Sequence, residues 1–126
     1  MEPTEYHITS SRDAGLLLIG LTGQATRDNA GRIAADVIAL VTAERADRVL
    51  VDCTRIGGRL GVTDTYYHVR EYRLGDHRPR RVAVIDLPEH AEYFTFHETA
   101  AANVGYGFLR YFSDPAAARR WAAAQE

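Results

Sequence analysis

The sequence predicts an α/β fold: a mixed, mostly parallel sheet of about five strands with an N-terminal antiparallel hairpin and four helices. Three observations support this prediction. Two apolar runs lie close together near the N-terminus, β-branched runs recur at 48–53 and 81–86, and segments with helical capping signals separate the later runs. Such alternation of strand and helix is typical of parallel strands joined by right-handed crossovers.

The first two strands form the predicted hairpin. Tyr6–Ser10 alternates polar and apolar residues, and Ser11–Gly15 has the composition of a turn. Leu16–Leu21 is a strongly apolar strand that ends at Gly23. Because so few residues connect the two runs, we expect these strands to pair in antiparallel fashion.

A helix and a buried strand follow the hairpin. Thr26 has the character of an N-cap for a helix that runs to about Arg45. The apolar residues of this helix lie on one side: Ile33, Val37, Ile38 and Val41. The run Arg48–Cys53 is apolar and β-branched almost throughout, as expected of a strand that is covered on both faces.

The middle of the chain combines a glycine-rich loop with a second helix. The loop, Arg55–Gly61, holds three glycines and leads to a helix capped by Thr63 or Asp64. This helix is predicted to end at Leu74, and Gly75 opens the turn toward the next strand.

The C-terminal part repeats the alternation of strand and helix. Arg81–Asp86 has the pattern of the earlier buried strand, and Pro88 begins a third helix that ends near Asn103. A fifth strand spans Gly107–Phe112. Asp114, followed by a proline, caps a last helix whose single large anchor is the chain's one tryptophan.

Composition restricts the functional classes. The formal net charge of −2 gives no positive field that would attract nucleic acid or an anionic membrane, and all 15 cationic side chains are arginines. Without lysine, neither Schiff-base nor P-loop chemistry is available. The single cysteine excludes an internal disulfide and suits a reducing compartment. No signal peptide or membrane-spanning run is present, so we expect one cytoplasmic domain over residues 1–126.

No metal, cofactor or catalytic site is predicted. The histidines never form a helical i, i+4 pair, and the spacing of His90 and His97 is too long for one ion, so both are interpreted as surface or half-buried residues. Cys53 ends a buried strand without a neighbouring base and is interpreted as a core residue. An enzyme would need His97, Glu98 and Asp86 at the mouth of the sheet, and no pattern gives them that geometry. We therefore expect a protein that binds and does not catalyse.

Two groups of residues are candidates for binding. The loop after the third strand and the helix start that follows it form a candidate surface for a partner or ligand: Thr54, Gly57, Gly58, Arg59, Gly61, Thr63 and Asp64. Aromatic residues of the second and third helices cannot all face the core at once and form a candidate pocket: Tyr66, Tyr67, Tyr93, Phe94 and Phe96.

Several stretches together resemble the SpoIIAA-like family. They are the hairpin strand at 16–23, VLVD at 49–52, VAVID at 82–86, and FHETAAANVG at 96–105 followed by a strand and the Asp114–Trp121 helix. This bacterial STAS-like family is related in topology to anti-sigma-factor antagonists and is likened to CRAL-TRIO lipid-transfer domains. The resemblance covers nearly the whole chain, and its most specific part is Glu98 and Thr99 with Asn103 and Gly105, followed by the Asp114–Trp121 helix.

The resemblance implies a module without catalytic residues. Anti-sigma-factor antagonists carry a phosphorylated serine in a D-S-S-G turn after the strand that corresponds to Arg48–Cys53. Ile56–Gly61 occupies that place in this chain, and the nearby hydroxyl groups belong to Thr54, Thr63 and Thr65. The serine switch of those antagonists is therefore missing.

Two functions remain open at this point. The favoured one is a non-enzymatic, STAS-like regulatory or binding module whose protein partner contacts the surface around Thr54–Tyr67. The alternative is a carrier that holds a lipid or another small apolar molecule between the sheet and the aromatic helices. The sequence also leaves open whether the chain forms a homodimer.

Overall fold

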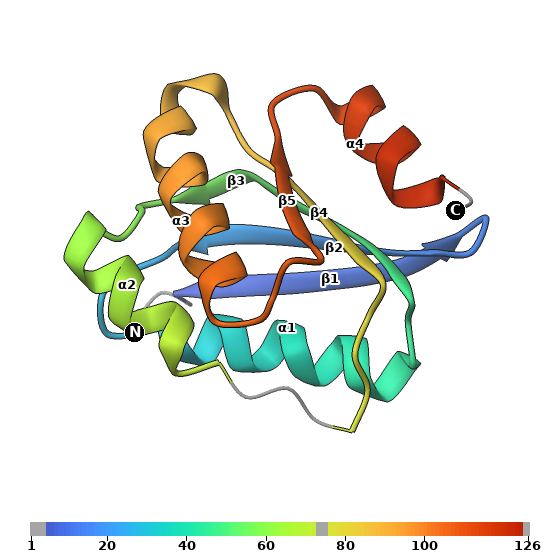
Figure 1. Cartoon of the computed structure of the whole chain (residues 1–126), viewed down its shortest axis with the longest axis horizontal. Helices are drawn as coiled ribbons and strands as arrows, with labels where there is room; N and C mark the ends of the chain where they lie inside the picture. The colour runs from blue at the N-terminus through green and yellow to red at the C-terminus, as the bar shows by residue number, and fades with distance from the viewer. Residues whose placement is uncertain (1–4, 73–75, 125–126) are drawn as a thin grey trace.

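The computed structural model describes residues 5–72 and 76–124, and these residues form the predicted mixed α/β fold (Figure 1). In chain order the elements are β1 (Tyr6–Asp13), β2 (Leu16–Gln24), α1 (Ala30–Glu44), β3 (Arg48–Gly57), α2 (Val62–Arg70), β4 (Arg81–Ile85), the 3-10 turn η1 (Pro88–His90), α3 (Ala91–Asn103), β5 (Leu109–Phe112) and α4 (Pro115–Ala123). The strands lie in the order β1-β2-β3-β4-β5, with β1 antiparallel to β2 and the other neighbouring pairs parallel. None of the helices within these residues is long and apolar enough to cross a membrane.

The helices are divided unequally between the two faces of the sheet. Each crossover from β2 to β5 steps to the next strand in the same direction, so right-handed connections place α1, α2 and α3 on one face. On that face the buried strand residues Leu17, Val49 and Val82 pack against Ile33 and Val41 of α1. Strand residues that point to the opposite face, Leu16, Ala83 and Ile85, pack against Ala118 and Ala122 of α4. Among the described helices, α4 therefore covers the other face of the sheet, opposite to α1, α2 and α3 (Figure 1).

The hairpin turn is shorter than predicted. β1 continues to Asp13, which pairs with Leu16, so the turn consists of Ala14 and Gly15. Both turn residues have positive φ angles (51° and 85°), as a tight two-residue hairpin turn requires. The predicted turn at Ser11–Gly15 is wrong because the end of this edge strand is polar and exposed, and its composition resembles that of a loop.

Helix α1 begins later than its predicted Thr26 cap. It starts at Ala30, and Thr26 and Asn29 instead close a loop before it. The Asn29 N–H donates to Thr26 Oγ1 (3.1 Å), and the Thr26 N–H donates to Asn29 Oδ1 (2.7 Å). The buried Asn29 amide also donates to the Gln24 carbonyl (2.9 Å), which fixes the path of the chain from β2 into α1.

Strand β3 is longer than the predicted Arg48–Cys53. It extends to Gly57, so the first part of the predicted loop, Arg55–Gly57, belongs to the strand. A register shift between Gly20 and Thr22 of β2 accompanies this extension. The irregularity interrupts the apolar alternation by which a strand is identified from sequence, and the prediction therefore ends too early.

Helix α2 ends earlier and β5 begins later than predicted. α2 spans Val62–Arg70 and not Thr63–Leu74, because the two residues after it donate to carbonyls three positions back and tighten its end. The predicted turn at Gly75 lies outside the described residues. The strand β5 starts at Leu109 and not at Gly107, since a turn precedes it.

Helix α4 is held at both ends. Asp114 caps its N-terminus as predicted and accepts the backbone N–H two residues further on (3.1 Å). At the C-terminal end, Arg48 donates to the Ala122 carbonyl (2.9 Å) and Arg81 donates to the Trp121 carbonyl (2.6 Å). Two arginines of neighbouring strands thus bind carbonyl groups at the end of the helix.

Replacement of Trp121 tests how strongly α4 is docked. The half-buried ring packs on Phe112 and lies 5.0 Å from the guanidinium carbon of Arg81. We expect Trp121→Ala to lower the free energy of unfolding by about 2–3 kcal/mol, less than for a fully buried tryptophan. Trp121→Phe keeps the aromatic contact and should cost less than about 1.5 kcal/mol in chemical denaturation. Equal stability of the wild type and Trp121→Ala would contradict this packing.

Candidate functional site

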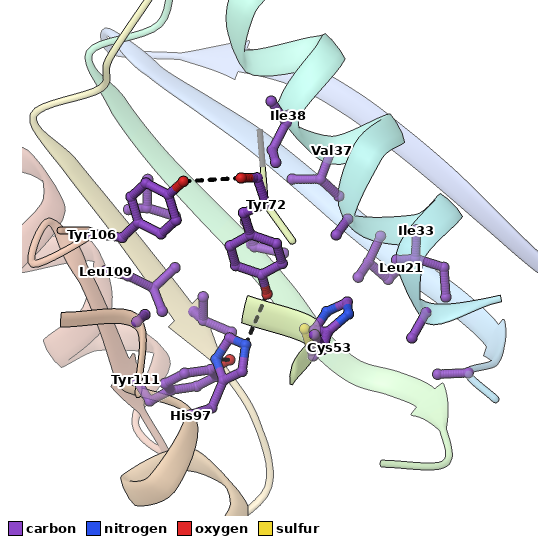
Figure 2. A pocket seen from close by; sticks show the side chains of 18 of the residues that line it. Leu21, Ile33, Val37, Ile38, Cys53, Tyr72, His97, Tyr106, Leu109 and Tyr111 are labelled. Atoms are coloured by element: carbon purple, nitrogen blue, oxygen red, sulfur yellow. Dashed lines mark hydrogen bonds between the residues drawn. The ribbon is translucent and has the colours of Figure 1, made fainter. Parts of the chain in front are cut away.

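An apolar cavity of about 200 Å³ lies between the sheet and helices α1, α2 and α3 (Figure 2). Aliphatic side chains of α1 and of the covered sheet face form part of its wall: Leu21, Ile33, Val37, Ile38, Val51, Val84 and Leu109. Aromatic and histidine side chains from α2, α3, β5 and the nearby connections form another part: His68, Tyr72, His77, Tyr93, His97, Tyr106, Phe108 and Tyr111. In Figure 2 the labelled residues of α1 face the tyrosines across this space.

His97 is the centre of a hydrogen-bonded chain that borders the cavity. Tyr72 Oη lies 2.8 Å from His97 Nε2, and Tyr111 Oη contacts the other ring nitrogen, Nδ1 (Figure 2). Burial lowers the pKa of His97 to about 3, so the ring is neutral near pH 7. A neutral imidazole donates through one nitrogen and accepts through the other, so one tyrosine accepts from the ring while the other donates to it.

Three parts of the chain bring these groups together. His97 lies on α3, Tyr111 lies on β5, and Tyr72 follows α2. The Glu98 carboxylate accepts the Tyr111 backbone N–H (2.9 Å), which fixes α3 against the strand. Phe94, one turn before His97, stacks on the Tyr111 ring with ring centres 5.3 Å apart. Packing around these three side chains therefore fixes the position of the hydrogen-bonded Tyr72–His97–Tyr111 chain.

A buried ion pair also borders the cavity. The Asp86 carboxylate follows β4 and is 1% exposed. Arg59 donates to it twice, with Nε 2.8 Å from Oδ2 and Nη2 2.7 Å from Oδ1. The other Arg59 donors bind backbone carbonyls at the end of β3 and just after it: Cys53, Ile56 and Gly58. All the guanidinium N–H groups are thereby engaged.

The Asp86 carboxylate, like the Arg59 guanidinium, has hydrogen-bond partners on both sides. Besides the Arg59 contacts, its Oδ1 accepts the Leu87 backbone N–H (2.8 Å) and lies 3.0 Å from His90 Nδ1. Burial pushes the pKa of this carboxyl upward, but the hydrogen bonds from Arg59, Leu87 and His90 outweigh burial and lower the pKa below its usual value. The pair therefore ties the loop after β3 to the end of β4.

Burial keeps two further groups near the cavity uncharged. It raises the pKa of the Cys53 thiol to about 12 and that of the Tyr93 hydroxyl to about 12. A thiol that stays protonated is a poor nucleophile and a poor metal ligand. Within residues 5–72 and 76–124, no three His, Cys, Asp or Glu side chains gather in positions that could hold a metal ion.

The predicted loop residues are distributed over several places and do not surround one ligand position. Gly57 ends β3, Gly61 precedes α2 as its N-cap residue, and Arg59 between them binds Asp86. The Thr54 hydroxyl donates to a carboxylate within the same strand (2.6 Å). Most of these residues therefore fix the path of the chain.

The remaining loop residues have different surroundings. Gly58 has a φ of 81°, and a Cβ there would collide with the Ala25 carbonyl, so the position requires glycine. Thr63 is exposed in the first turn of α2. Asp64 forms an ion pair with the exposed Arg27 (3.3 Å). Thr63 and Asp64 are thus the part of the predicted surface that stays open to contact.

The predicted aromatic group is brought together in part. Tyr93 lines the cavity, as expected of a pocket residue. Phe94 is buried on Tyr111, and Phe96 packs with the core between α2 and α3. Tyr66 and Tyr67 on α2 are 45% and 61% exposed and lie outside the cavity lining.

Sequence reasoning missed the polar side of the cavity. His97 is 4% exposed, so the expectation of a surface or half-buried histidine is wrong. A signal for its burial was available, because Phe94, His97 and Ala101 share one face of the helix and the two neighbours are apolar. The contacts with Tyr72 and Tyr111 depend on tertiary packing and have no such local signal.

The positions singled out by the family resemblance do not form a site. Glu98 binds the backbone of β5, whereas Thr99 and Asn103 are exposed on α3. His97, Glu98 and Asp86, the residues that an enzyme would need together, each have separate partners.

Solved structures share this fold, although no protein-family model and no curated protein matches the chain. An anti-sigma factor antagonist from Mycobacterium paratuberculosis aligns with a TM-score of 0.59 at 13% identity, over 94% of this chain and 95% of that one. An uncharacterised DUF3478 protein from Shewanella loihica, described as having a SpoIIAA-like fold, aligns with a TM-score of 0.55 at 20% identity, over 98% and 99% of the two chains. The chain therefore has the SpoIIAA-like fold that the sequence resemblance predicts.

Because the His97 ring is buried and neutral, we expect acid to destabilise the protein. Its pKa in the folded state lies below the unfolded value of about 6.5, so the unfolded chain binds the proton more readily. This contribution to stability is complete above about pH 6.5 and falls by about 1.4 kcal/mol per pH unit toward pH 3. Between pH 7 and 4.5 the loss from this residue should reach about 2–3 kcal/mol in chemical denaturation.

The variant His97→Gln isolates this contribution, because glutamine can bind both tyrosines but does not titrate. We expect it to be less stable than the wild type at pH 7 and to lose less stability on acidification. Other titrating groups act in both proteins and cancel in the comparison. Equal losses in the two proteins would show that His97 does not cause the acid sensitivity.

Proposed function

We propose that this chain is a non-enzymatic binding module that holds a small apolar molecule in the cavity between its sheet and helices α1, α2 and α3. The observation that carries the proposal is the cavity itself, about 200 Å³ of space with aliphatic walls and one polar side. Protein interiors normally pack as densely as organic crystals, and apolar cavities that remain open bind apolar ligands. The proposal includes a cytoplasmic location and a single domain over residues 1–126.

The state of the ionisable groups supports binding over catalysis. Arg59 and Asp86 neutralise each other, and their donors and acceptors are engaged. Burial keeps His97 neutral and holds the Cys53 thiol protonated through its raised pKa. A general base works best with a pKa near the working pH, and a thiol must ionise to act as a nucleophile. With a pKa of about 3 His97 is a weak base, and with a pKa of about 12 Cys53 stays a thiol.

Native mass spectrometry of gently purified protein tests the binding function. We expect the wild type to retain a small molecule, seen as an added mass that denaturation releases. Val37→Phe places a ring in the cavity and should abolish this mass, because Val37 lines the space. Ala35→Phe adds the same ring at an exposed position of the same helix and should leave the mass unchanged. Retention of the mass by Val37→Phe would place the ligand outside the cavity.

A second candidate function is protein binding through the outer surface of α2. Tyr66 and Tyr67 are exposed there with ring centres 5.2 Å apart, and the guanidinium of Arg70 lies 5.4 Å from the Tyr66 ring. Tyrosine and arginine are enriched where proteins bind one another. The structural similarity to an anti-sigma factor antagonist also supports a regulatory role with a protein partner.

The double variant Tyr66→Ala/Tyr67→Ala tests the partner function. It should reduce the affinity for a purified partner by more than about thirtyfold, because exposed aromatic anchors contribute about 2 kcal/mol or more to binding. The variant Thr99→Ala/Asn103→Ala alters exposed positions on neighbouring α3 and serves as the matched control. An equal affinity of the partner for both variants would exclude the α2 surface.

A further inference from the structure

The volume of the cavity limits the size of its ligand. An apolar cavity of about 150 Å³ binds benzene, whereas pockets for drug-sized ligands begin at about 300 Å³. The cavity of this protein, about 200 Å³, lies between these sizes. It suits one substituted ring or two fused rings and is too small for a long acyl chain.

The charges around the cavity limit the charge of its ligand. The Arg59 donors are all engaged by Asp86 and by backbone carbonyls, so they offer no site to an anion. Asp86 is likewise saturated and offers no site to a cation. Burial lowers the pKa of His68 and leaves this lining histidine neutral. The Nε2 group of His77, another lining histidine, binds the Ala46 carbonyl (2.6 Å) and lies 3.9 Å from the Asp47 carboxylate. A charged ligand would therefore lose its hydration without gaining a counter-charge.

The Tyr72–His97–Tyr111 chain offers a neutral polar contact. A phenol hydroxyl has one donor and two acceptor lone pairs, three positions in all. Tyr111 contacts His97 and also forms a hydrogen bond with Tyr93, which leaves one position of its hydroxyl for a ligand. A change of the His97 tautomer reverses both links of the chain and exchanges its donor and acceptor ends. A ligand hydroxyl, which both donates and accepts, suits either arrangement.

We propose that the ligand is a compact, uncharged molecule of one or two rings whose hydroxyl group binds the Tyr72–His97–Tyr111 chain. The inference rests on the proposed binding function and narrows it. Fatty acids and other long-chain lipids exceed the space that the cavity encloses, and carboxylates and amines find no free counter-charge there.

Calorimetric titration of the full chain at pH 7 with four probes tests this ligand class. The probes are 1-naphthol, naphthalene, 1-naphthoate and oleate. We expect 1-naphthol to bind most tightly, with naphthalene about tenfold weaker for the loss of one hydrogen bond. Binding of 1-naphthoate should be weaker than that of 1-naphthol by at least about a hundredfold, and oleate should not bind.

Variants test whether the preference for 1-naphthol over naphthalene depends on the Tyr72–His97–Tyr111 chain. Tyr72→Phe/Tyr111→Phe removes both hydroxyls and should reduce the preference for 1-naphthol over naphthalene to about twofold or less. Unchanged binding of naphthalene by the same variant shows that the cavity is still folded. Tyr66→Phe removes an exposed hydroxyl outside the cavity lining and should keep the wild-type preference.

The results distinguish a failure of the proposed binding function from a failure of the inferred ligand class. If the wild type binds none of the four probes, the binding function itself fails. If 1-naphthoate or oleate binds as tightly as 1-naphthol, or naphthalene binds equally well, the binding function stands and the inferred ligand class is overturned. These comparisons use the wild type and do not depend on the folding of any variant.

Discussion

One topological constraint determines where the cavity lies. Because the strands from β2 to β5 follow one another in sequence order, right-handed crossovers place α1, α2 and α3 on the same face of the sheet. Helix α1 packs on the strands through Ile33 and Val41, whereas α2 and α3 form a separate cluster with one another: Val69, Ala100 and Ala101. The cavity is bordered by both groups of helices and by the sheet beneath them.

Charge and polarity are separated within this cavity. The permanent charges of Arg59 and Asp86 are paired with each other, while His97 and its tyrosines are polar but neutral. Loss of one partner of such a buried pair costs about 3–5 kcal/mol, so the loop between β3 and α2 is firmly held. A preformed cavity of this kind binds with little loss of conformational freedom, but it accepts a narrow range of ligands.

Local patterns predict most of the fold, and tertiary contacts decide the site. The apolar runs of β3 and β4 and the Asp114 cap are signals within a few residues, so these elements are predicted, although β3 extends beyond its predicted end. The end of β1 is missed because an exposed edge strand need not alternate. The cavity depends on distances between α3, β5 and the segment after α2, and these distances have no signature in any one segment. His97, for example, has an apolar helical face as its local signal, but its tyrosine partners are 25 and 14 positions away.

Helix α2 belongs to both candidate surfaces. His68, near its end, lines the cavity, while Tyr66 and Tyr67 are exposed to solvent. A helix as short as Val62–Arg70 has little stability of its own, so its position depends on packing against α3 and on what fills the space beside it. A molecule in the cavity and a protein on the outer surface would therefore contact the same element. The two candidate functions are compatible for this reason.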